Sequence, residues 1–428
     1  MYYDVIVIGA GLAGLMAAEA AQSRGARVSI FAQGMGSLPL TTGCIDVLGY
    51  LPSIAKIPIS SPRAALTQFR EDHPHHPYNK VGEKKMFSGL THFLELCRAN
   101  GLPFEGNLDS NFLLPTALGT LHPTCLAPET MNAGHLSIPG SALLLGFEGI
   151  KDFSPFMAAE NLNLLHSQGK IAISFRAQLL KKMDLHGKSF IGLNLAQAFD
   201  DRAFREEFAT LVRPLIRKGE KLGLPAVLGF RSPREALVDL REKLSTEIFE
   251  IPLPPPSIPG LRLYNSLKSY FKMKGGRLIL GLSSLKPLTV SGRVQGFTLG
   301  DAKTSPTYRA SAFVLATGKF VGGGLNAAPN RIYETLFGLP VKHPPNRQDW
   351  FTTEFLSPEG QPFNSFGLEV DENLRPVDFS GRVIYENLFA AGGIIAHADS
   401  MSEKSGGGVA ISTGHLAGKL AAEFAQTG

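Results

Sequence analysis

Three glycines near the N-terminus have the spacing of a phosphate-binding turn. Gly9, Gly11 and Gly14 form a GxGxxG set between an apolar, strand-like run over residues 3–8 and a helix-favouring run over residues 12–23. In such a unit the first glycine permits the tight turn, the second leaves room for a pyrophosphate, and the third lets helix and strand approach closely. The helix N-terminus adds free N–H groups and a partial positive charge. The pattern therefore predicts a site for the phosphates of a nucleotide or flavin.

One feature of this kind of site is missing. An acidic residue about 20 residues after the turn normally accepts hydrogen bonds from the adenosine ribose. The second strand, expected over residues 27–32, ends instead at Ala32, and Gln33 follows. Either Gln33 or a backbone group binds the ribose, or the nucleotide lacks the adenosine half. These residues leave the choice between FAD and FMN open.

Three further segments place small and polar residues where a flavin could lie. One is in an aperiodic loop region over residues 33–62, where its hydroxyls either meet the cofactor or cap a turn. The others end apolar strands or open the last helix, expected over 409–424, whose N-terminus could stabilise charge on a reduced flavin. Together with the first turn, the predicted cofactor-binding residues are Gly9, Gly11, Gly14, Gln33, Thr41, Thr42, Gly43, Thr317, Gly318, Gly392, Gly393, Gly406, Gly407 and Gly408.

Histidines are the first residues to consider for proton transfer. His122, His343, His397 and His415 lie near the predicted flavin segments, although each such histidine is more often structural. We prefer His397 as the catalytic base because it follows the strand that ends at Gly393.

Metal and thiol chemistry have weaker support. His73, His75 and His76 form a cluster, but the prolines among them break helical ligand spacing, so no metal site is predicted. The three cysteines, Cys44, Cys97 and Cys125, fit neither a disulfide framework nor an iron–sulfur ligand set, which indicates a reducing compartment. Cys44 is expected to fill space, because no base can be placed beside it from sequence.

Composition narrows the class of protein. With 44% hydrophobic and 18% charged residues, the chain is expected to fold as a globular protein. The net charge of +5 is spread along the sequence, which argues against nucleic acid as a partner. No apolar run reaches the length of about 18 residues that spans a membrane, so any membrane contact is expected to be peripheral.

The elements that position these residues indicate an α/β fold. We expect a Rossmann-like FAD/NAD(P)-binding domain with a parallel sheet, formed by residues 1–140 and 261–428, and a second, inserted α/β domain over residues 141–260 that binds substrate or a partner. The expected elements of the second domain are a strand over 142–147 and helices over 156–168, 199–219 and 232–244. The proline-rich stretch 251–260 is expected to lack regular structure and to mark the boundary. A helix over 261–274 and strands over 277–280 and 295–299 are expected to follow.

The order of several segments resembles one flavoprotein family. The segments are the first glycine turn, LTTGCIDVLGY, HPYNKVG, LPTALGTLHPTCLAP, PLPPPSIPGLRLYNSL, ATGKFVGGGL, ENLFAAGGIIAH and GGGVAISTGHLAG. Together they resemble the B subunits of the anaerobic glycerol-3-phosphate dehydrogenases, within the fumarate-reductase-like FAD/NAD(P)-binding group, over nearly the whole chain.

That resemblance implies a function in a complex. It implies oxidation of sn-glycerol 3-phosphate to dihydroxyacetone phosphate, with FMN as the cofactor and electrons passed to quinone. The implied partners are a second flavoprotein, the A subunit, together with a membrane-attached iron–sulfur protein, the C subunit. These partners would hold the chain in the cytoplasm, peripherally at the inner face of the membrane. Arg262, Arg277 and Arg331 are candidates for the substrate phosphate because they flank the expected flavin side.

Three alternatives to this role stay open from the sequence. The flavin could relay electrons from the A subunit, the chain could be a scaffold that has lost its cofactor, or it could be another soluble flavin dehydrogenase with a different substrate.

Overall fold

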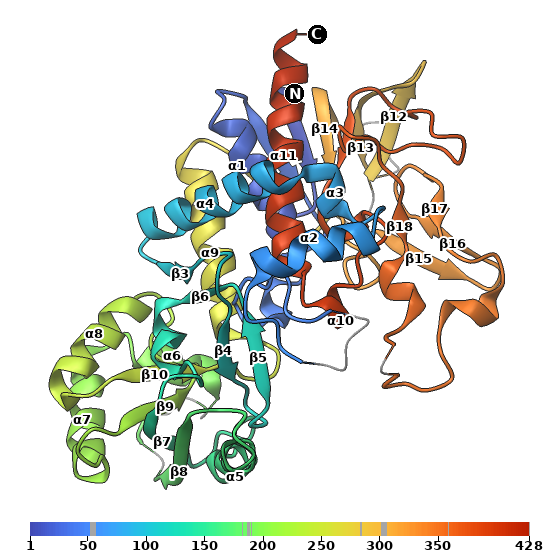
Figure 1. The fold of residues 1–428 in the computed structure, drawn as a ribbon. Helices are drawn as coiled ribbons and strands as arrows, with labels where there is room; N and C mark the ends of the chain where they lie inside the picture. Colours follow the sequence, from blue (N-terminus) through green and yellow to red (C-terminus); the bar gives the residue numbers. More distant parts are fainter. Residues whose placement is uncertain are drawn as a thin grey trace.

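The computed structural model describes residues 1–51, 57–181, 183–185, 189, 191–282, 285–300, 306–357 and 359–427, so part of the expected loop region 33–62 lies outside the described residues. The chain forms two lobes, each built around a sheet of its own (Figure 1). The larger lobe contains both ends of the chain, and the smaller lobe projects from it.

The sheet of the larger lobe joins strands from the two ends of the chain. Its order is β11-β2-β1-β14-β13-β12, and β19 pairs with β14 beside this path. The strands are β1 (Tyr2–Ile8), β2 (Val28–Phe31), β11 (Arg277–Ile279), β12 (Leu285–Val290), β13 (Arg293–Leu299), β14 (Thr307–Leu315) and β19 (Leu388–Ala390). Five of them pair in parallel, whereas β12 and β13 pair antiparallel. The carboxyl ends of β1, β2, β14 and β19 therefore meet at one edge.

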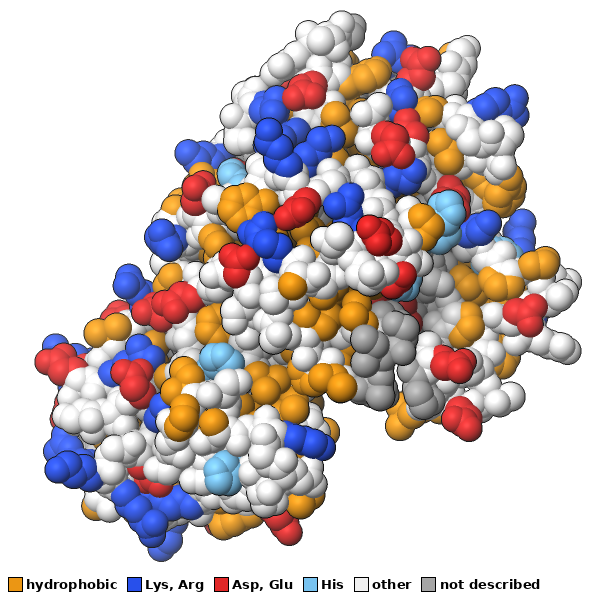
Figure 2. Space-filling view, viewed as in Figure 1, with side chains coloured by type: hydrophobic (Ala, Val, Ile, Leu, Met, Phe, Trp, Pro, Cys, Tyr) orange, Lys and Arg blue, Asp and Glu red, His pale blue; other side chains and the backbone are white. Residues whose placement is uncertain are grey.

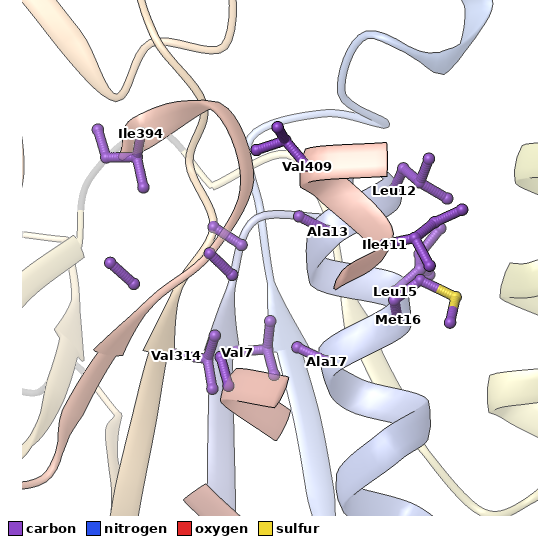
Figure 3. Close-up of a cluster of buried hydrophobic side chains, with 14 of the residues drawn as sticks. Val7, Leu12, Ala13, Leu15, Met16, Ala17, Val314, Ile394, Val409 and Ile411 are labelled. Atoms are coloured by element: carbon purple, nitrogen blue, oxygen red, sulfur yellow. The ribbon is translucent and has the colours of Figure 1, made fainter. Parts of the chain in front are cut away.

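Two helices with small residues pack closely beside this sheet. They are α1 (Leu12–Gln22) and α11 (Gly406–Thr427). A Cβ added at Gly414 would lie 2.4 Å from Ala13 O, and one added at Gly418 would lie 2.1 Å from Ala17 O, so glycine is required at this crossing. Figure 3 shows the resulting core, with α1 and α11 beside the paired strands β1 and β14.

The smaller lobe has its own parallel sheet and its own core. Its sheet order is β10-β9-β7-β8, and the strands are β7 (Gly140–Phe147), β8 (Ile173–Leu180), β9 (Lys221–Pro225) and β10 (Ile248–Ile251). The helices are α5 (Pro155–Ser167), α6 (Gly192–Ala198), α7 (Arg202–Val212) and α8 (Pro233–Leu244). A separate cluster of buried apolar side chains fills this lobe. The predicted α/β class with parallel sheets is confirmed, and the exact domain bounds stay a prediction.

The remaining elements lie between and around the two sheets. The helices are α2 (Pro62–Asp72), α3 (Pro77–Val81), α4 (Glu83–Ala99), α9 (Ile258–Met273) and α10 (Ser400–Glu403), with short 3₁₀ turns η1 (Leu38–Leu40), η2 (Glu129–Gly134), η3 (Arg213–Leu215), η4 (Arg347–Trp350), η5 (Pro362–Ser365) and η6 (Gly392–Ile394). The strands are β3 (Phe104–Gly106), β4 (Phe112–Pro115), β5 (Leu121–Thr124), β6 (Leu126–Pro128), β15 (Leu325–Ala328), β16 (Arg331–Glu334), β17 (Val341–Lys342) and β18 (Gly367–Leu368).

Two expectations about element bounds are wrong. The proline-rich stretch expected over 251–260 lacks regular structure only over residues 252–257, because β10 ends at Ile251 and α9 already begins at Ile258. Ser257 caps that helix by accepting a hydrogen bond from Gly260 N–H, and a proline fits the first turn of a helix, where no partner for its nitrogen is needed. The helix expected over 199–219 is shorter, since α7 ends at Val212 and Pro214 lies in the 3₁₀ turn that follows.

The surface matches the scattered charge of the sequence. On the face in Figure 2, Lys and Arg are interspersed with Asp and Glu over both lobes. No described helix is long and apolar enough to cross a membrane.

Candidate functional site

The first glycine turn brings β1, α1 and β14 into close contact. Gly9 has a φ of +114°, and a Cβ there would lie 2.2 Å from Ala316 O. A Cβ at Gly14 would lie 2.0 Å from Gly9 O. Neither position has room for a side chain, so these two glycines build the turn.

Gly11 is different because the space beside it is open. A Cβ added there would meet only Gly36 Cα within 4 Å, at a distance of 3.9 Å. Gly11 is also the N-cap of α1, and no side chain caps that helix. Free amides at a helix N-terminus beside open space form a site for phosphate oxygens.

The other predicted glycines converge on the same edge of the sheet. Gly393 faces Gly318 across the ends of β19 and β14, since its added Cβ would lie 3.9 Å from Gly318 Cα. Gly392 contacts Ala13 of α1, and Thr413 Oγ1 of α11 accepts a hydrogen bond of 2.8 Å from Gly392 N–H. The ends of three strands and the first turns of two helices thus form one glycine-lined cradle.

Thr317 supplies a polar group to this cradle. Its hydroxyl is buried and has no hydrogen-bond partner among the described residues. Such a group costs roughly 1–3 kcal/mol if it stays unsatisfied. Gln33 follows the end of β2, and its Oε1 would lie 3.5 Å from a Cβ added at Gly323, in the glycine turn after Thr317. Thr317 and Gln33, which are two of the predicted polar residues, therefore lie at the cradle.

The segment Thr41–Gly43 lies beside the first turn of α9 and partly caps itself. Thr41 Oγ1 donates a hydrogen bond to Leu38 O (2.9 Å), and Thr42 Oγ1 accepts one from Cys44 N–H (3.3 Å). The turn-capping role that the sequence allows is thus present. A Cβ at Gly43 would lie 2.5 Å from Pro259 Cβ, so glycine permits the close approach to α9.

The glycine run at the start of α11 touches the same loop. Gly408 N–H donates a hydrogen bond of 2.8 Å to Asp46 O, and a Cβ at Gly407 would lie 3.0 Å from Asp46 N. On its other side, the first turn of α11 approaches Gly392, whose added Cβ would lie 4.0 Å from Ala410 Cα. This helix N-terminus therefore joins the loop to the strand ends.

Comparison with known proteins identifies the family. The model of the FAD binding domain family matches residues 4–409. The probable B subunit of the anaerobic glycerol-3-phosphate dehydrogenase of Halobacterium salinarum is 32% identical over 98% of each chain, and the B subunit of this enzyme from Yersinia pestis is 31% identical over 100% of each. The chain belongs to this family of B subunits.

Some solved structures are also similar to this chain over nearly its full length. They include 3-ketosteroid Δ1-dehydrogenase from Sterolibacterium denitrificans, at 14% identity, a TM-score of 0.43 and 100% coverage of both chains. The open conformation of a flavocytochrome c3 fumarate reductase matches at 11% identity and a TM-score of 0.45, covering 99% of this chain and 78% of that one.

The residues of the cradle fit the flavin that this family binds. Open space at Gly11, the uncapped N-terminus of α1 and the unpartnered Thr317 hydroxyl are the features that a phosphate-bearing polar cofactor would satisfy. The cofactor is thus a flavin, as predicted.

The predicted base of this family member is already paired. His397 has a φ of +72°, and its Nε2 lies 2.8 Å from Glu369 Oε1. This hydrogen bond is the main cause of the lowered pKa of Glu369. The centroid of the His397 ring also lies 5.3 Å from that of the His75 ring. His397 follows η6 by three residues, but its side chain belongs to a small polar cluster with Glu369 and His75.

The other predicted histidines have different surroundings. His122 pairs with Asp46, and His343 Nδ1 lies 2.6 Å from Pro344 O. His415 is 4% exposed within α11, where its Cβ packs against Gly89 of α4. His76 pairs with Glu403 at 3.3 Å, and no three His, Cys, Asp or Glu side chains in the described chain are grouped as a metal site.

At least two of the three arginines proposed for the substrate phosphate lie elsewhere. Arg262 is buried and forms a two-pronged ion pair with Glu250, with distances of 2.6 and 3.0 Å, and its Nε donates to Gly229 O. The assignment of Arg262 is therefore wrong. Arg277 lies beside Met1 and Tyr3, at the opposite end of β1 from Gly9, and Arg331 lies over the Tyr333 ring in the β15–β16 hairpin.

The buried Arg262 joins α9 of the larger lobe to β10 of the smaller one. Arg262→Ala is expected to lower the free energy of unfolding by roughly 3–5 kcal/mol, because Glu250 would stay buried without its cation. Arg24→Ala, which breaks the exposed pair with Glu423, should cost less than about 1 kcal/mol. Urea unfolding followed by circular dichroism measures the free energy of unfolding of both variants. Equal losses would contradict the stabilising role of the buried Arg262–Glu250 pair.

Sequence reasoning missed one partly buried cation near the cradle. Lys319 follows Gly318, and its Nζ donates hydrogen bonds to Asn364 O and to Ala398 O. Burial lowers its pKa to about 8, against the opposing effect of Asp399 and Glu403. Lys319 therefore ties the end of β14 to two distant loops. Its position after the ATG segment was the available signal, but its acceptors are backbone carbonyls that no sequence pattern marks.

Proposed function

We propose that this flavin dehydrogenase oxidises sn-glycerol 3-phosphate to dihydroxyacetone phosphate and passes the electrons toward quinone, as the B subunit of a larger complex. The observation that carries the proposal is the full-length match, at about 30% identity, to proteins named as the B subunit of anaerobic glycerol-3-phosphate dehydrogenase. The open glycine cradle supports it.

The cofactor-binding role belongs to the cradle. In this proposal Gly9, Gly11 and Gly14 hold the flavin phosphate, and Thr317 donates its free hydroxyl hydrogen. The other predicted residues line the cofactor: Gln33, Thr41, Thr42, Gly43, Gly318, Gly392, Gly393, Gly406, Gly407 and Gly408. The bound flavin would supply the oxidising power, since it accepts the hydride of the substrate. FMN is proposed because Ala32 offers no acceptor to an adenosine ribose, and FAD is the alternative.

Two further parts of this chain, the start of α11 and His397, have proposed roles in the reaction. The first turns of α11 lie beside Gly392 at the cradle, where the positive end of the helix dipole would stabilise negative charge on a reduced flavin. His397 stays a proposed base, with Glu369 fixing its ring through Nε2.

Two other proteins of the complex are the proposed partners of this chain. They are the A subunit, which is a flavoprotein, and the C subunit, which is an iron–sulfur protein. The names of the relatives, which designate them as B subunits, support the existence of other subunits. In this proposal the iron–sulfur protein holds the complex at the cytoplasmic face of the membrane.

Electron relay is a second candidate for this chain. It is favoured by the positions of Arg262 and Arg277, which leave two of the three arginines proposed for the substrate phosphate away from the cradle. If the A subunit oxidises the alcohol, this chain only needs to accept its electrons.

An anaerobic reduction experiment separates the two candidates. The purified chain is expected to be yellow, and sn-glycerol 3-phosphate should bleach the flavin absorbance near 450 nm within seconds. Release and chromatography of the cofactor would identify FMN or FAD. Bleaching only after the A subunit is added would favour the relay, and a folded, colourless chain would contradict both.

A further inference from the structure

Several large apolar side chains are exposed on the loops beside the cradle. Phe355 and Leu356, between η4 and η5, are 89% and 83% exposed, and Val321, after β14, is 82% exposed. Phe351 and Met401 of α10 are exposed as well. A single exposed apolar residue is ordinary, but several on neighbouring loops mark a surface that a partner covers. We call these five residues the apolar patch.

Contacts between the loops make the patch one surface. The centroids of the Phe320 and Phe363 rings lie 6.2 Å apart, so the segment that leads to Val321 packs against η5. A Cβ added at Gly360 would lie 2.5 Å from Ser402 Oγ, so the loop between η4 and η5 passes beside α10 (Figure 1). The patch is therefore built from three segments that are distant in sequence and adjacent in space.

Hydrogen bonds fix the loop that presents the most exposed of these side chains. Gln361 Nε2 donates to Glu354 O at 2.8 Å and to Phe355 O at 3.2 Å. Gln361 Oε1 accepts a hydrogen bond of 3.0 Å from Thr352 N–H. The exposure of Phe355 and Leu356 is thus a property of a loop that its own side chains hold in shape.

The same segments continue into the cradle. Val321 lies three residues after Gly318, which faces Gly393 at the strand ends. Lys319 Nζ donates hydrogen bonds to Asn364 O in η5 and to a backbone carbonyl just before α10. A protein bound on the patch would therefore contact segments that are bonded directly to the proposed flavin site.

The charge around the patch is acidic. Residues 347–363 contain three carboxylates, Asp349, Glu354 and Glu359, and a single cation, Arg347, in a chain whose net charge is +5. The three carboxylates are exposed and form no ion pair within the part of the chain that the structure describes. An apolar centre with an acidic rim complements a partner surface that is apolar with a basic rim. A second copy of this chain fits poorly, because a symmetric contact would bring like charges together.

We propose that the apolar patch is the docking surface for the redox protein that accepts electrons from the reduced flavin, and that this protein presents an apolar surface with a basic rim. The inference rests on the proposed function, in which the acceptor is an iron–sulfur protein. In the complex, two electrons would pass one at a time from the flavin to the iron–sulfur group, and the flavin protons would go to solvent.

Binding of the detergent-solubilised iron–sulfur subunit to the flavin-loaded chain tests this surface. Phe355→Ser combined with Leu356→Ser should weaken the affinity by at least roughly tenfold, because a few buried apolar anchors supply most of the binding free energy at an interface. Phe379→Ser is the matched control, since Phe379 is 79% exposed on a turn closed by Gly381 N–H and Asp378 O, and it should leave the affinity unchanged. Flavin content and circular dichroism check that each variant is folded.

Charge reversal tests the acidic rim separately. Glu354→Lys combined with Glu359→Lys should slow association by at least roughly tenfold at low salt and change dissociation little, and added salt should reduce the difference. Glu242→Lys, at an exposed position in α8, is the control and should have no effect. Carbodiimide labelling followed by mass spectrometry should show that the bound partner protects Glu354 and Glu359 but not Glu242.

Three outcomes would overturn the proposal in different ways. If the wild-type chain binds the iron–sulfur subunit and both double variants bind it equally well, the docking surface lies elsewhere and the proposed function stands. If Glu354 and Glu359 are already protected from labelling in the chain alone, the smaller lobe or a second copy covers the patch, and sedimentation velocity distinguishes the two. If the wild-type chain binds no iron–sulfur subunit at any salt concentration, the proposed complex fails together with this surface.

Discussion

Gly11→Ala is expected to produce a folded protein that has lost most of its flavin. The added Cβ would contact only Gly36 Cα, at 3.9 Å, so the fold itself has room for it. That same room is where the phosphate of the cofactor is proposed to lie, and a methyl group there would push it off the N-terminal amides of α1. An overpacking cost of about 1–3 kcal/mol corresponds to a loss of roughly 5- to 150-fold in affinity. The flavin-to-protein absorbance ratio and the melting temperature of the flavin-free protein measure the two effects separately.

Two other glycines provide matched comparisons. Gly14→Ala would place its Cβ 2.0 Å from Gly9 O, so it should lower stability by at least about 3 kcal/mol and lose flavin because the turn itself is damaged. Gly192→Ala in α6 has its nearest neighbour at 3.5 Å and should change neither property. Normal flavin content in Gly11→Ala would show that the phosphate does not lie at this turn.

His415→Leu is expected to stabilise the protein, and more strongly at acidic pH. His415 is 4% exposed, and neither ring nitrogen has a hydrogen-bond partner in the described chain. Burial lowers its pKa to about 3, and Lys419, His92 and Arg24 act in the same direction. Replacing the ring by an apolar side chain removes the unsatisfied groups. This change should raise the free energy of unfolding by about 1–3 kcal/mol at pH 7.

The pH dependence follows from the difference between the folded and unfolded states. Below pH 6.5 the unfolded chain binds a proton at His415, whereas the folded chain does not bind one until near pH 3. Wild-type stability therefore falls as the pH falls through this window, by up to about 1.4 kcal/mol per pH unit from this group. Between pH 7 and pH 5 the advantage of His415→Leu should grow by about 2 kcal/mol. Urea unfolding of flavin-free protein at both pH values measures it, with the exposed His166→Leu as control. An equal pH dependence in variant and wild type would contradict the explanation.

Local sequence patterns are sufficient to predict the first half of the cradle. The strand, the GxGxxG turn and the helix are adjacent in sequence, so their spacing alone predicts β1, the turn and α1. Glycine runs near the C-terminus likewise indicate where the strand ends and helix N-termini lie. The contacts between Gly393 and Gly318, or between Gly408 and Asp46, depend on how distant strands pair, and no local pattern contains that information.

Side-chain partners are the harder part. Arg262 is a candidate for the substrate phosphate because it flanks the expected flavin side, but Glu250 on β10 neutralises it in the folded chain. Cys44 is buried against Met131, as the sequence indicates for a space-filling thiol. His122, by contrast, pairs with Asp46 from a distant loop, and no local pattern marks that partner. In both cases the residue types indicate chemistry, and only the tertiary fold determines which group is adjacent.

The strand order of the larger lobe has a consequence for biosynthesis. β1 is made long before its neighbour β14, and the cradle also needs β19 and the first turns of α11, which are made later still. The smaller lobe, by contrast, draws its four-stranded sheet from one continuous stretch between β7 and β10 and can pack its core while synthesis continues. The apolar strand β1 therefore stays unpaired on that side until β14 (Thr307–Leu315) has been made. A chain that lacks α11 would therefore have an incomplete cradle, and we expect it to retain no flavin.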